Sequence, residues 1–387
     1  MTIAREAYSR TYWVVRSGLP EARRYALYAE AAKRQITVGP SFDDAGIGEG
    51  LASRTAVLWD VAEADKRELI DWFIKFYPGT IVQFAGKGDT KPPDPIPPPT
   101  GGRSLKMGLH TAASGQISAF DQFDMLQPKW IKVMSNQDIE GITRLAREHD
   151  ATFIIRAYLD FWENNNPRKV FAVKFHEWTR DSLSAIFNVL NAHGRRYIVE
   201  CHNEPNLVRE GMMRDGDNHP TDPGSWCAGH QFNTWIHEWR RAFQIDFGTR
   251  ISLMTPGLSP GDSVANMRAD SNQFYREMAQ AISNFGHMGI HCYWSDEAPL
   301  HLAIAELNDL RQQYPGVPKY ITEFSHNKPA DLNKKAGEIA AFVRAIEKMP
   351  DVMGATAFVA ADPHAMFVNE NWQVQGMARR VRSVMGY

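Results

Sequence analysis

Residues 197–206 read YIVECHNEPN, an apolar strand pattern that runs into a polar loop. Its first half is apolar and follows the charged, glycine-containing run 193–196, which predicts a short buried strand. Pro205 ends the pattern, because proline removes a backbone donor and biases the preceding Glu204 away from a helix. The sequence therefore places a carboxylate at the end of a strand, a position typical of functional groups in α/β barrels.

A second segment has the same design. Residues 319–325 read KYITEFS, which is another short apolar strand that ends in a glutamate, Glu323. A lone Asn-Glu-Pro is as readily a surface turn, but two strands that end in glutamate favour a shared site. We therefore expect Glu204 and Glu323 to face each other.

From residue 105 onward, strand and helix patterns alternate. Apolar stripes at a spacing of three to four, such as Phe274, Met278 and Ile282, predict helices that pack on a barrel. Eight strand and helix units over about 280 residues predict a (β/α)8 TIM barrel at 105–387. The expected strands are 106–110, 130–134, 152–158, 197–201, 251–254, 289–293, 319–323 and 354–359.

The first 89 residues predict a separate small α+β domain. Strand and helix patterns follow in the order β-α-β-β-α-β, which suits a two-layer sandwich of ferredoxin-like type. Residues 90–104 are rich in proline and glycine and predict a stiff linker before the barrel. The aromatic residues Tyr12, Trp13 and Trp72 would let this domain bind a glycan or a protein partner, although packing in its own core explains them better.

Composition excludes several classes of function. A formal net charge of −2 gives no reason to expect nucleic acid or an anionic membrane as a partner. No apolar run is long enough to span a bilayer, and residues 1–8 lack the apolar core of a signal peptide. We expect a soluble protein, either cytoplasmic or exported with its signal removed. Cys201, Cys227 and Cys292 suit neither a disulfide framework nor a zinc site, so we expect no metal and no cofactor.

Polar and aromatic side chains gather at the predicted carboxyl ends of the strands, where barrel active sites lie. Strands four and seven end on opposite sides of the barrel opening, so Glu204 and Glu323 can meet across it. Two carboxylates that flank one bond are the requirement for glycoside hydrolysis, and a separation of about 5–5.5 Å allows one of them to attack the sugar. The further candidates for substrate contacts are His110, Arg156, His202, Asn203, His291, Tyr293, Trp294 and Phe358.

Three motifs together resemble a known group of enzymes. Residues 203–205 (NEP), 291–293 (HCY) and 322–324 (TEF) are similar to the signature of clan A retaining glycoside hydrolases, especially the cellulase-like and β-xylosidase-like families. The resemblance covers residues 105–387 and implies an oligo- or polysaccharide substrate. It implies that Glu204 is the general acid/base and Glu323 the nucleophile. It also implies that Asn203 contacts the sugar 2-hydroxyl, Tyr293 orients Glu323 and His291 lines the site.

The sequence departs from these families at several positions. His202 stands where a tryptophan is common, and Phe358, or Trp372 further along, stands where strand eight often carries a tryptophan. Strand two carries Lys132 in place of an arginine. Glu200 is charged inside a strand and needs a partner if it faces the interior, for which Lys132 and Arg156 are the candidates.

Two alternatives remain open at this point. The first is a carbohydrate-binding barrel without catalysis, which the unusual His202 and the weak strand-eight platform suggest. The second is a metal-dependent hydrolase that uses His110, His202 and His291. A glycan that binds without being cleaved would favour the first, and activity that survives strong chelators would remove the second.

Overall fold

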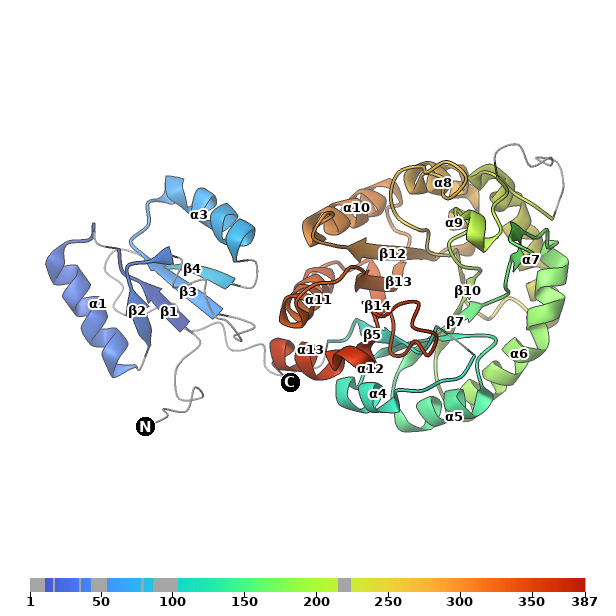
Figure 1. The fold of residues 1–387 in the computed structure, drawn as a ribbon, viewed down its shortest axis with the longest axis horizontal. Coiled ribbons are helices and arrows are strands. Elements are labelled where there is room, and N and C mark those ends of the chain that lie inside the picture. The colour runs from blue at the N-terminus through green and yellow to red at the C-terminus, as the bar shows by residue number, and fades with distance from the viewer. Residues whose placement is uncertain are drawn as a thin grey trace. The chain divides into compact units, whose positions relative to one another are not determined.

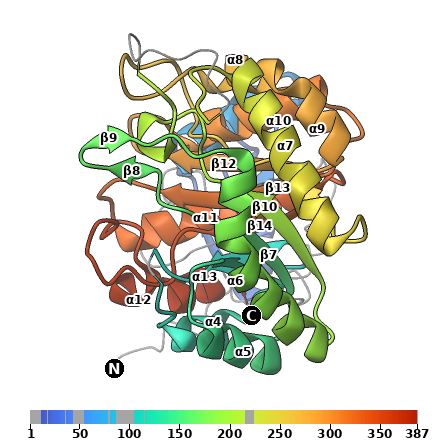
Figure 2. The same ribbon diagram turned by 90° about the vertical axis from the view of Figure 1, so that its right-hand side faces the viewer.

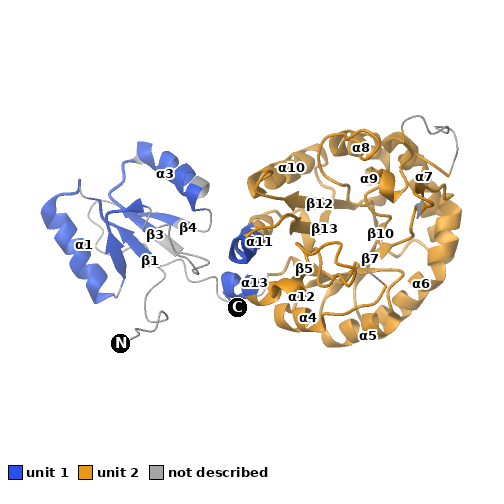
Figure 3. Cartoon of the chain, in the orientation of Figure 1, with its two compact units in different colours: residues 1–102, 331–341, 380–387 blue, residues 103–330, 342–379 orange. Residues whose placement is uncertain are grey.

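The computed structural model describes residues 11–16, 18–34, 36–42, 54–77, 80–85, 104–113, 115–214 and 224–386. The chain divides into two compact units (Figure 3). Residues 1–102, 331–341 and 380–387 form the N-terminal unit, and residues 103–330 and 342–379 form the barrel unit. The division thus groups two C-terminal segments with the N-terminal unit. Of the linker predicted at 90–104, only Ser104 lies within the described residues.

The barrel unit is built on an eight-stranded sheet in the described part of the chain, and all neighbouring strands in it are parallel. The order is β11-β10-β7-β6-β5-β14-β13-β12. A parallel bridge between Thr255 and Met288 brings its two edges together, with Gly289 N–H donating to the Thr255 carbonyl at 2.9 Å. The predicted (β/α)8 barrel is therefore confirmed. Its strands are β5 (Met107–His110), β6 (Trp130–Met134), β7 (Thr152–Ala157), β10 (Tyr197–Cys201), β11 (Leu253–Met254), β12 (Met288–Trp294), β13 (Lys319–His326) and β14 (Val352–Ala357).

Helices α4 to α10 surround these strands (Figures 1 and 2). The Asp138 side chain caps α5 by accepting a hydrogen bond from Gly141 N–H at 2.7 Å, which satisfies a free donor of the first turn. The short elements β8 (Trp162–Glu163), β9 (Asn166–Pro167) and η2 (Val208–Glu210) lie in the connections. The described helices after residue 103 are α4 (Phe120–Leu126), α5 (Ile139–Glu148), α6 (Ala172–Ala192), α7 (Gly229–Phe247), α8 (Ser271–Glu277), α9 (Ala279–Phe285), α10 (Leu300–Gln313), α11 (Leu332–Glu347), α12 (Trp372–Gln375) and α13 (Met377–Met385). Residues of α11 and α13 are divided between the two units.

The amino-terminal half of the barrel interior is apolar. Ile154, Ile198 and Met254 pack in one cluster with Tyr320, and Trp130 covers it. Strand residues alternate in direction, so the residues two positions further along β6, β7 and β10 also face the interior. These residues are charged, and they are Lys132, Arg156 and Glu200.

The N-terminal unit corrects one prediction. Its sheet has the order β2-β1-β3-β4, and every described pair in it is parallel, so the ferredoxin-like arrangement is wrong. The strand and helix order fits both arrangements, because the direction of the third strand depends on the connection that precedes it, most of which lies outside the described residues. The elements are β1 (Thr11–Val14), α1 (Glu21–Lys33), β2 (Thr37–Gly39), β3 (Arg54–Trp59), α3 (Glu63–Phe76) and β4 (Thr80–Ala85).

Apolar clusters cover both faces of this sheet. Trp13 belongs to the cluster that contains Leu27 of α1, whereas Tyr12 belongs to the cluster that contains Phe73 of α3. Tyr12 and Trp13 are buried, and Trp72 packs against the second cluster. Core packing is therefore confirmed as the place of these three aromatic residues. A glycan or protein partner for this unit stays a prediction.

Two smaller predictions concern the cysteines and membrane spans. Cys201 and Cys292 are buried in β10 and β12, as expected of cysteines that act as small apolar groups. Cys227 is exposed, and all three thiols are free. Among the helices of the described residues, none has the length and apolar character that crossing a membrane requires.

Candidate active site

Glu323 reaches the barrel interior through an irregularity in β13. Tyr320 belongs to the interior cluster, and strict alternation from Tyr320 would turn Glu323 outward. The register of β12 and β13 shifts immediately before His291, which pairs with Glu323. Thr322 is thus the extra residue of a bulge, a feature that re-aims side chains beside active sites. The Glu323 side chain is 5% exposed in this position.

Glu204 lies in the tight loop that follows β10. Its φ of 37° is unusual for a residue with a side chain. The surrounding hydrogen bonds fix this conformation. Glu204 N–H donates to the Gly257 carbonyl at 3.1 Å, Leu207 N–H donates to the Glu204 carbonyl at 2.8 Å, and the Trp226 indole donates to the Pro205 carbonyl at 2.7 Å. The loop therefore holds the Glu204 carboxyl at the carboxyl end of the barrel.

The Glu323 carboxylate is surrounded by donors. Lys132 Nζ donates to Oε1 at 3.2 Å, and Arg156 Nη2 makes a close contact with the same oxygen. His110 Nε2 lies 3.8 Å from it. Tyr293 Oη donates to the other oxygen, Oε2, at 2.5 Å. Hydrogen bonds from cations and a phenol favour the ionised carboxylate and fix its direction.

Glu204 has a different environment. His291 Nδ1 lies 2.9 Å from Glu204 Oε1 and 3.7 Å from Glu323 Oε2, so the ring stands between the two carboxyl groups. Burial raises the pKa of Glu204 to about 7, against the opposing influence of Arg156 and Lys132. Burial also holds the pKa of His291 well below its usual value, so this ring is neutral. One oxygen of Glu204 lies within 4.8 Å of one oxygen of Glu323.

Glu200 has the partners that the sequence predicted. It is fully buried, with Lys132 Nζ at 2.8 Å and Arg156 Nε at 3.5 Å from its Oε2. Burial alone would raise the pKa of Glu200, but Lys132 and Arg156 hold it at about 2. Gly257 N–H donates to its other oxygen at 3.2 Å. Sequence reasoning did not foresee that Lys132 also contacts Glu323, because spacing along a strand does not reveal which side chains meet across a barrel.

Asn203 and an unpredicted carboxyl group lie beside Glu204. The side chain of Glu210, in η2, hydrogen-bonds Asn203, and burial, together with the nearby charge of Glu204, raises the pKa of Glu210 to about 7. The pKa of Tyr158 is also raised, first by burial and then by Glu210. The only signal for Glu210 in the sequence is an acidic residue in the loop after the NEP motif.

His110 and Phe358 lie next to each other at the same end of the barrel. Their rings meet edge to face, with centroids 5.3 Å apart, and Phe367 packs on Phe358 at 5.0 Å. Burial and the neighbouring Lys132 keep the pKa of His110 well below its usual value. His110 thus lies between Phe358 and Glu323, next to both of them. Trp372, the other candidate on strand eight, is 2% exposed.

His202 and Trp294 lie in the core. His202 is 2% exposed and its ring packs among aromatic rings, with the Phe161 centroid at 4.5 Å. Burial lowers the pKa of His202 to about 3. Trp294 is 1% exposed and stacks on Phe324, because alternation along β12 sends it to the face opposite His291. We therefore leave both residues out of the proposed substrate contacts. The other rings around His202 are Phe175, Trp226, Phe232 and Trp235.

The spacing of Glu204, His291 and Glu323 would also suit a metal ion. The cationic side chains that already contact Glu323 disfavour a further cation there, because like charges at this distance repel strongly inside a protein. The alternative metal site of His110, His202 and His291 does not form, since within the described residues the groups with metal-ligand spacing contain one histidine each.

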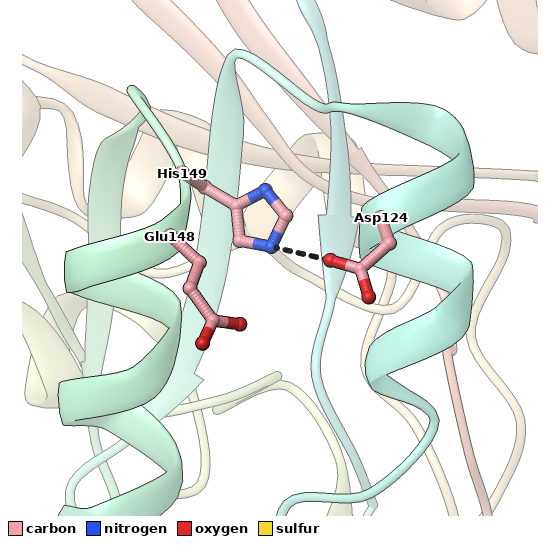
Figure 4. A group of neighbouring side chains, drawn as sticks. All are labelled: Asp124, Glu148 and His149. Carbon is pink, nitrogen blue, oxygen red and sulfur yellow. Dashed lines mark ion pairs between the residues drawn. The ribbon is translucent and has the colours of Figure 1, made fainter.

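Asp124, Glu148 and His149 form the second such group, away from the barrel interior (Figure 4). The buried His149 ring directs Nε2 toward Asp124 Oδ1 at 3.5 Å. Both oxygens of Glu148 are already paired, with Arg144 Nε at 2.9 Å and Arg147 Nη2 at 2.8 Å. The arginines therefore supply the positive charge that a metal would bring, and we interpret this group as a surface ion-pair network.

No protein-family model matches the chain, and no relative is found among curated proteins. Similar solved structures include a GH128 (subgroup II) endo-β-1,3-glucanase from Sorangium cellulosum, with a TM-score of 0.48, 15% identity, and coverage of 71% of this chain and 97% of that one. A GH128 (subgroup IV) endo-β-1,3-glucanase from Lentinula edodes has a TM-score of 0.45, 13% identity, and coverage of 73% and 99%. A β-glucosidase from Exiguobacterium marinum has a TM-score of 0.40, 11% identity, and coverage of 67% and 90%. Likenesses at this level assign neither a family nor an activity to the chain.

Proposed function

We propose that the barrel unit is a retaining glycoside hydrolase of clan A type that cleaves a β-glycosidic bond in an oligo- or polysaccharide. The observation that carries this proposal is the pairing of Glu204 and Glu323, with oxygens within 4.8 Å of each other in unlike environments. Retaining enzymes hold their two carboxyl groups about 5–5.5 Å apart, whereas inverting enzymes need about 6.5–9.5 Å to admit a water. The short separation therefore favours double displacement.

In the first step, Glu323 attacks the anomeric carbon while Glu204 donates its proton to the glycosidic oxygen. The bond to the leaving group breaks, and an ester forms between the sugar and Glu323. The environments support these roles. Cations and the Tyr293 hydroxyl keep Glu323 ionised and aimed, whereas burial keeps a proton on Glu204 up to about pH 7.

In the second step, Glu204 acts as a base. Having lost its proton, it accepts one from a water molecule, whose oxygen attacks the anomeric carbon and releases Glu323 as a carboxylate. Asn203, beside Glu204, is the proposed partner of the sugar 2-hydroxyl. Arg156 and Phe358 are proposed to border the sugar at the Glu323 side. His110 is fully buried and packs against Phe358, so it is proposed to position that ring and not to contact the sugar itself.

The stereochemical course tests this proposal. Hydrolysis of an aryl β-glycoside or a β-glycan, followed by proton NMR from the first turnovers, is expected to give the β-anomer first. The rate is expected to be the same after treatment with a strong chelator, because no step needs a metal. Initial release of the α-anomer would reject double displacement. Loss of activity on chelation that returns with metal would favour metal-dependent hydrolysis instead.

Gly257 offers a test of how His291 is held. A Cβ at this position would lie 2.2 Å from His291 Cδ2, so Gly257→Ala must displace the ring that contacts Glu204. We expect kcat/KM to fall by about 100-fold, the usual order for a misplacement of about 1 Å at an active site. Gly337→Ala is the matched control, because a Cβ there would meet nothing within 4 Å in the described part of the chain. A folded Gly257→Ala protein with wild-type kcat/KM would contradict the proposed placement of His291.

A further inference from the structure

Lys132, Arg156, Glu200 and Glu323 form a buried group of opposite charges, which we call the charge quartet. They come from β6, β7, β10 and β13, and each side chain is at most 5% exposed. Buried charges are costly unless they are paired. With Lys132 protonated, two cations face two carboxylates, and the quartet is balanced while Glu323 is ionised. Burial lowers the pKa of Lys132 to about 7, so this balance holds below about pH 7.

Each cation of the quartet is shared between the two carboxylates. Lys132 Nζ lies 2.8 Å from Glu200 Oε2 and 3.2 Å from Glu323 Oε1. Arg156 contacts Glu323 through Nη2 and lies 3.5 Å from Glu200 through Nε. Glu200 thus competes with Glu323 for both cations, yet it takes no part in either of the two proposed chemical steps.

The competition of Glu200 for Lys132 and Arg156 affects how reactive Glu323 is as a nucleophile. A carboxylate that held both cations alone would be a weaker nucleophile, because its charge would be more strongly stabilised before attack than after it. When Glu323 becomes a neutral ester, the quartet without Glu200 would contain two buried cations and no anion. With Glu200 present, the excess is a single positive charge.

We propose that Glu200 is a positioning residue for the nucleophile, which shares Lys132 and Arg156 with Glu323 and so limits how tightly these cations hold it. The sharing of charge rests on the contacts alone. Its effect on turnover rests on the proposed glycosidase function. Other titratable groups also interact with the quartet, and they include His110 of β5, Tyr158 after β7, Cys201 of β10, His202 and Glu204 of the following loop, Glu210 of η2, Tyr275 of α8, and His291 and Tyr293 of β12.

Opposite changes of charge test this proposal through Glu204, whose pKa Glu200 raises and Lys132 lowers. We expect Glu200→Gln to lower the pKa of Glu204 by about one unit and Lys132→Met to raise it by about one unit. The double variant restores the balance and is expected to return the value close to that of wild type. Carboxyl NMR titration of protein labelled with ¹³C-glutamate measures these shifts without any turnover, with Glu204→Gln identifying the signal.

Turnover provides the second readout. Both limbs of the pH profile of kcat/KM are expected to move down in pH for Glu200→Gln and up for Lys132→Met. The double variant is expected to be more active than either single variant, because it removes a pair and leaves no unmatched charge. If each substitution only damaged the structure, the double variant would instead be less active than either single variant. Lys129→Met, at the other end of the barrel, is the matched control and is expected to shift nothing.

The outcomes separate this inference from the proposed function. Shifts of the same sign in both single variants, or a double variant no closer to wild type than Glu200→Gln, would overturn the shared-charge role. If Lys132→Met does not fold, Glu200→Gln and the double variant still test the inference. The double variant must then reverse the shift in the Glu204 pKa that Glu200→Gln causes. Opposite shifts in a protein that cleaves no glycoside would support the charge sharing and refute the glycosidase function.

Discussion

Glu323→Ala is expected to lower kcat/KM by about 10⁴-fold or more on every substrate, because in the proposed mechanism no other group forms the covalent intermediate. The variant removes the carboxylate that Lys132, Arg156 and Tyr293 hold in place. Leaving-group chemistry does not rescue it, since the missing bond is the one to the enzyme. Steady-state rates on an aryl β-glycoside and a β-glycan measure the effect.

The matched control for this variant is Glu140→Ala, an exposed glutamate in the first turn of α5. It removes the same group far from the proposed site and is expected to leave kcat/KM unchanged. Turnover by Glu323→Ala within tenfold of wild type would contradict the assignment of the nucleophile.

Glu204→Ala is expected to show a loss that depends on the leaving group. A substrate whose leaving oxygen needs a proton is expected to lose about 10²–10⁴-fold in kcat/KM, the usual contribution of general acid catalysis. An aryl glycoside with a strongly activated leaving group is expected to keep most of its kcat/KM, while its kcat falls because the covalent intermediate accumulates. Equal losses on both substrates would contradict the role of Glu204 as the acid.

The pH dependence of wild type follows from the same group. In the proposed mechanism Glu204 carries a proton in the first step, and burial raises its pKa to about 7. The kcat/KM of wild type is therefore expected to fall above about pH 7, by tenfold per pH unit. Glu204→Gln is expected to lose this alkaline limb. An alkaline limb that persists in Glu204→Gln would belong to another group whose pKa is about 7, and Glu210 and Lys132 are the two candidates.

The barrel and its two glutamates could be predicted because the relevant signals are local. The strands at 197–201 and 319–323 are apolar runs with clear ends, and Pro205 marks where the first one stops. The carboxyl ends of parallel strands share one end of a barrel, so the meeting of Glu204 and Glu323 follows from topology. The burial of Glu200 next to Lys132 and Arg156 follows from the cost of an unpaired charge.

Features that depend on details of the backbone could not be predicted. The bulge at Thr322 turns Glu323 inward, and no residue in 319–325 predicts a bulge there. His202 has a φ of 71°, which breaks strand alternation and places its ring in the aromatic core. The position of Trp294, in contrast, could have been predicted. On a regular strand the residue next to Tyr293 points to the face opposite to that of Tyr293.

The N-terminal unit shows how topology can remain open when its elements are correctly predicted. The described strands and helices follow the predicted β-α-β-β-α-β order, yet the sheet is parallel in the described part of the chain. Val14 and Val15 are buried next to the buried Trp13, and such a continuous apolar run indicates a strand covered on both faces. That signal was present in the sequence and favours the parallel arrangement.

Azide rescue of the two glutamate variants is the most direct test of their roles. Azide is small enough to take the place of a missing carboxyl group at either position. Glu204→Ala is expected to yield a β-glycosyl azide, because azide intercepts the covalent intermediate from the side that Glu204 occupied. Glu323→Ala is expected to yield the α-glycosyl azide, because azide replaces the nucleophile. Finding the two anomers exchanged, or a wild-type protein that binds glycans and cleaves none, would contradict the proposed mechanism.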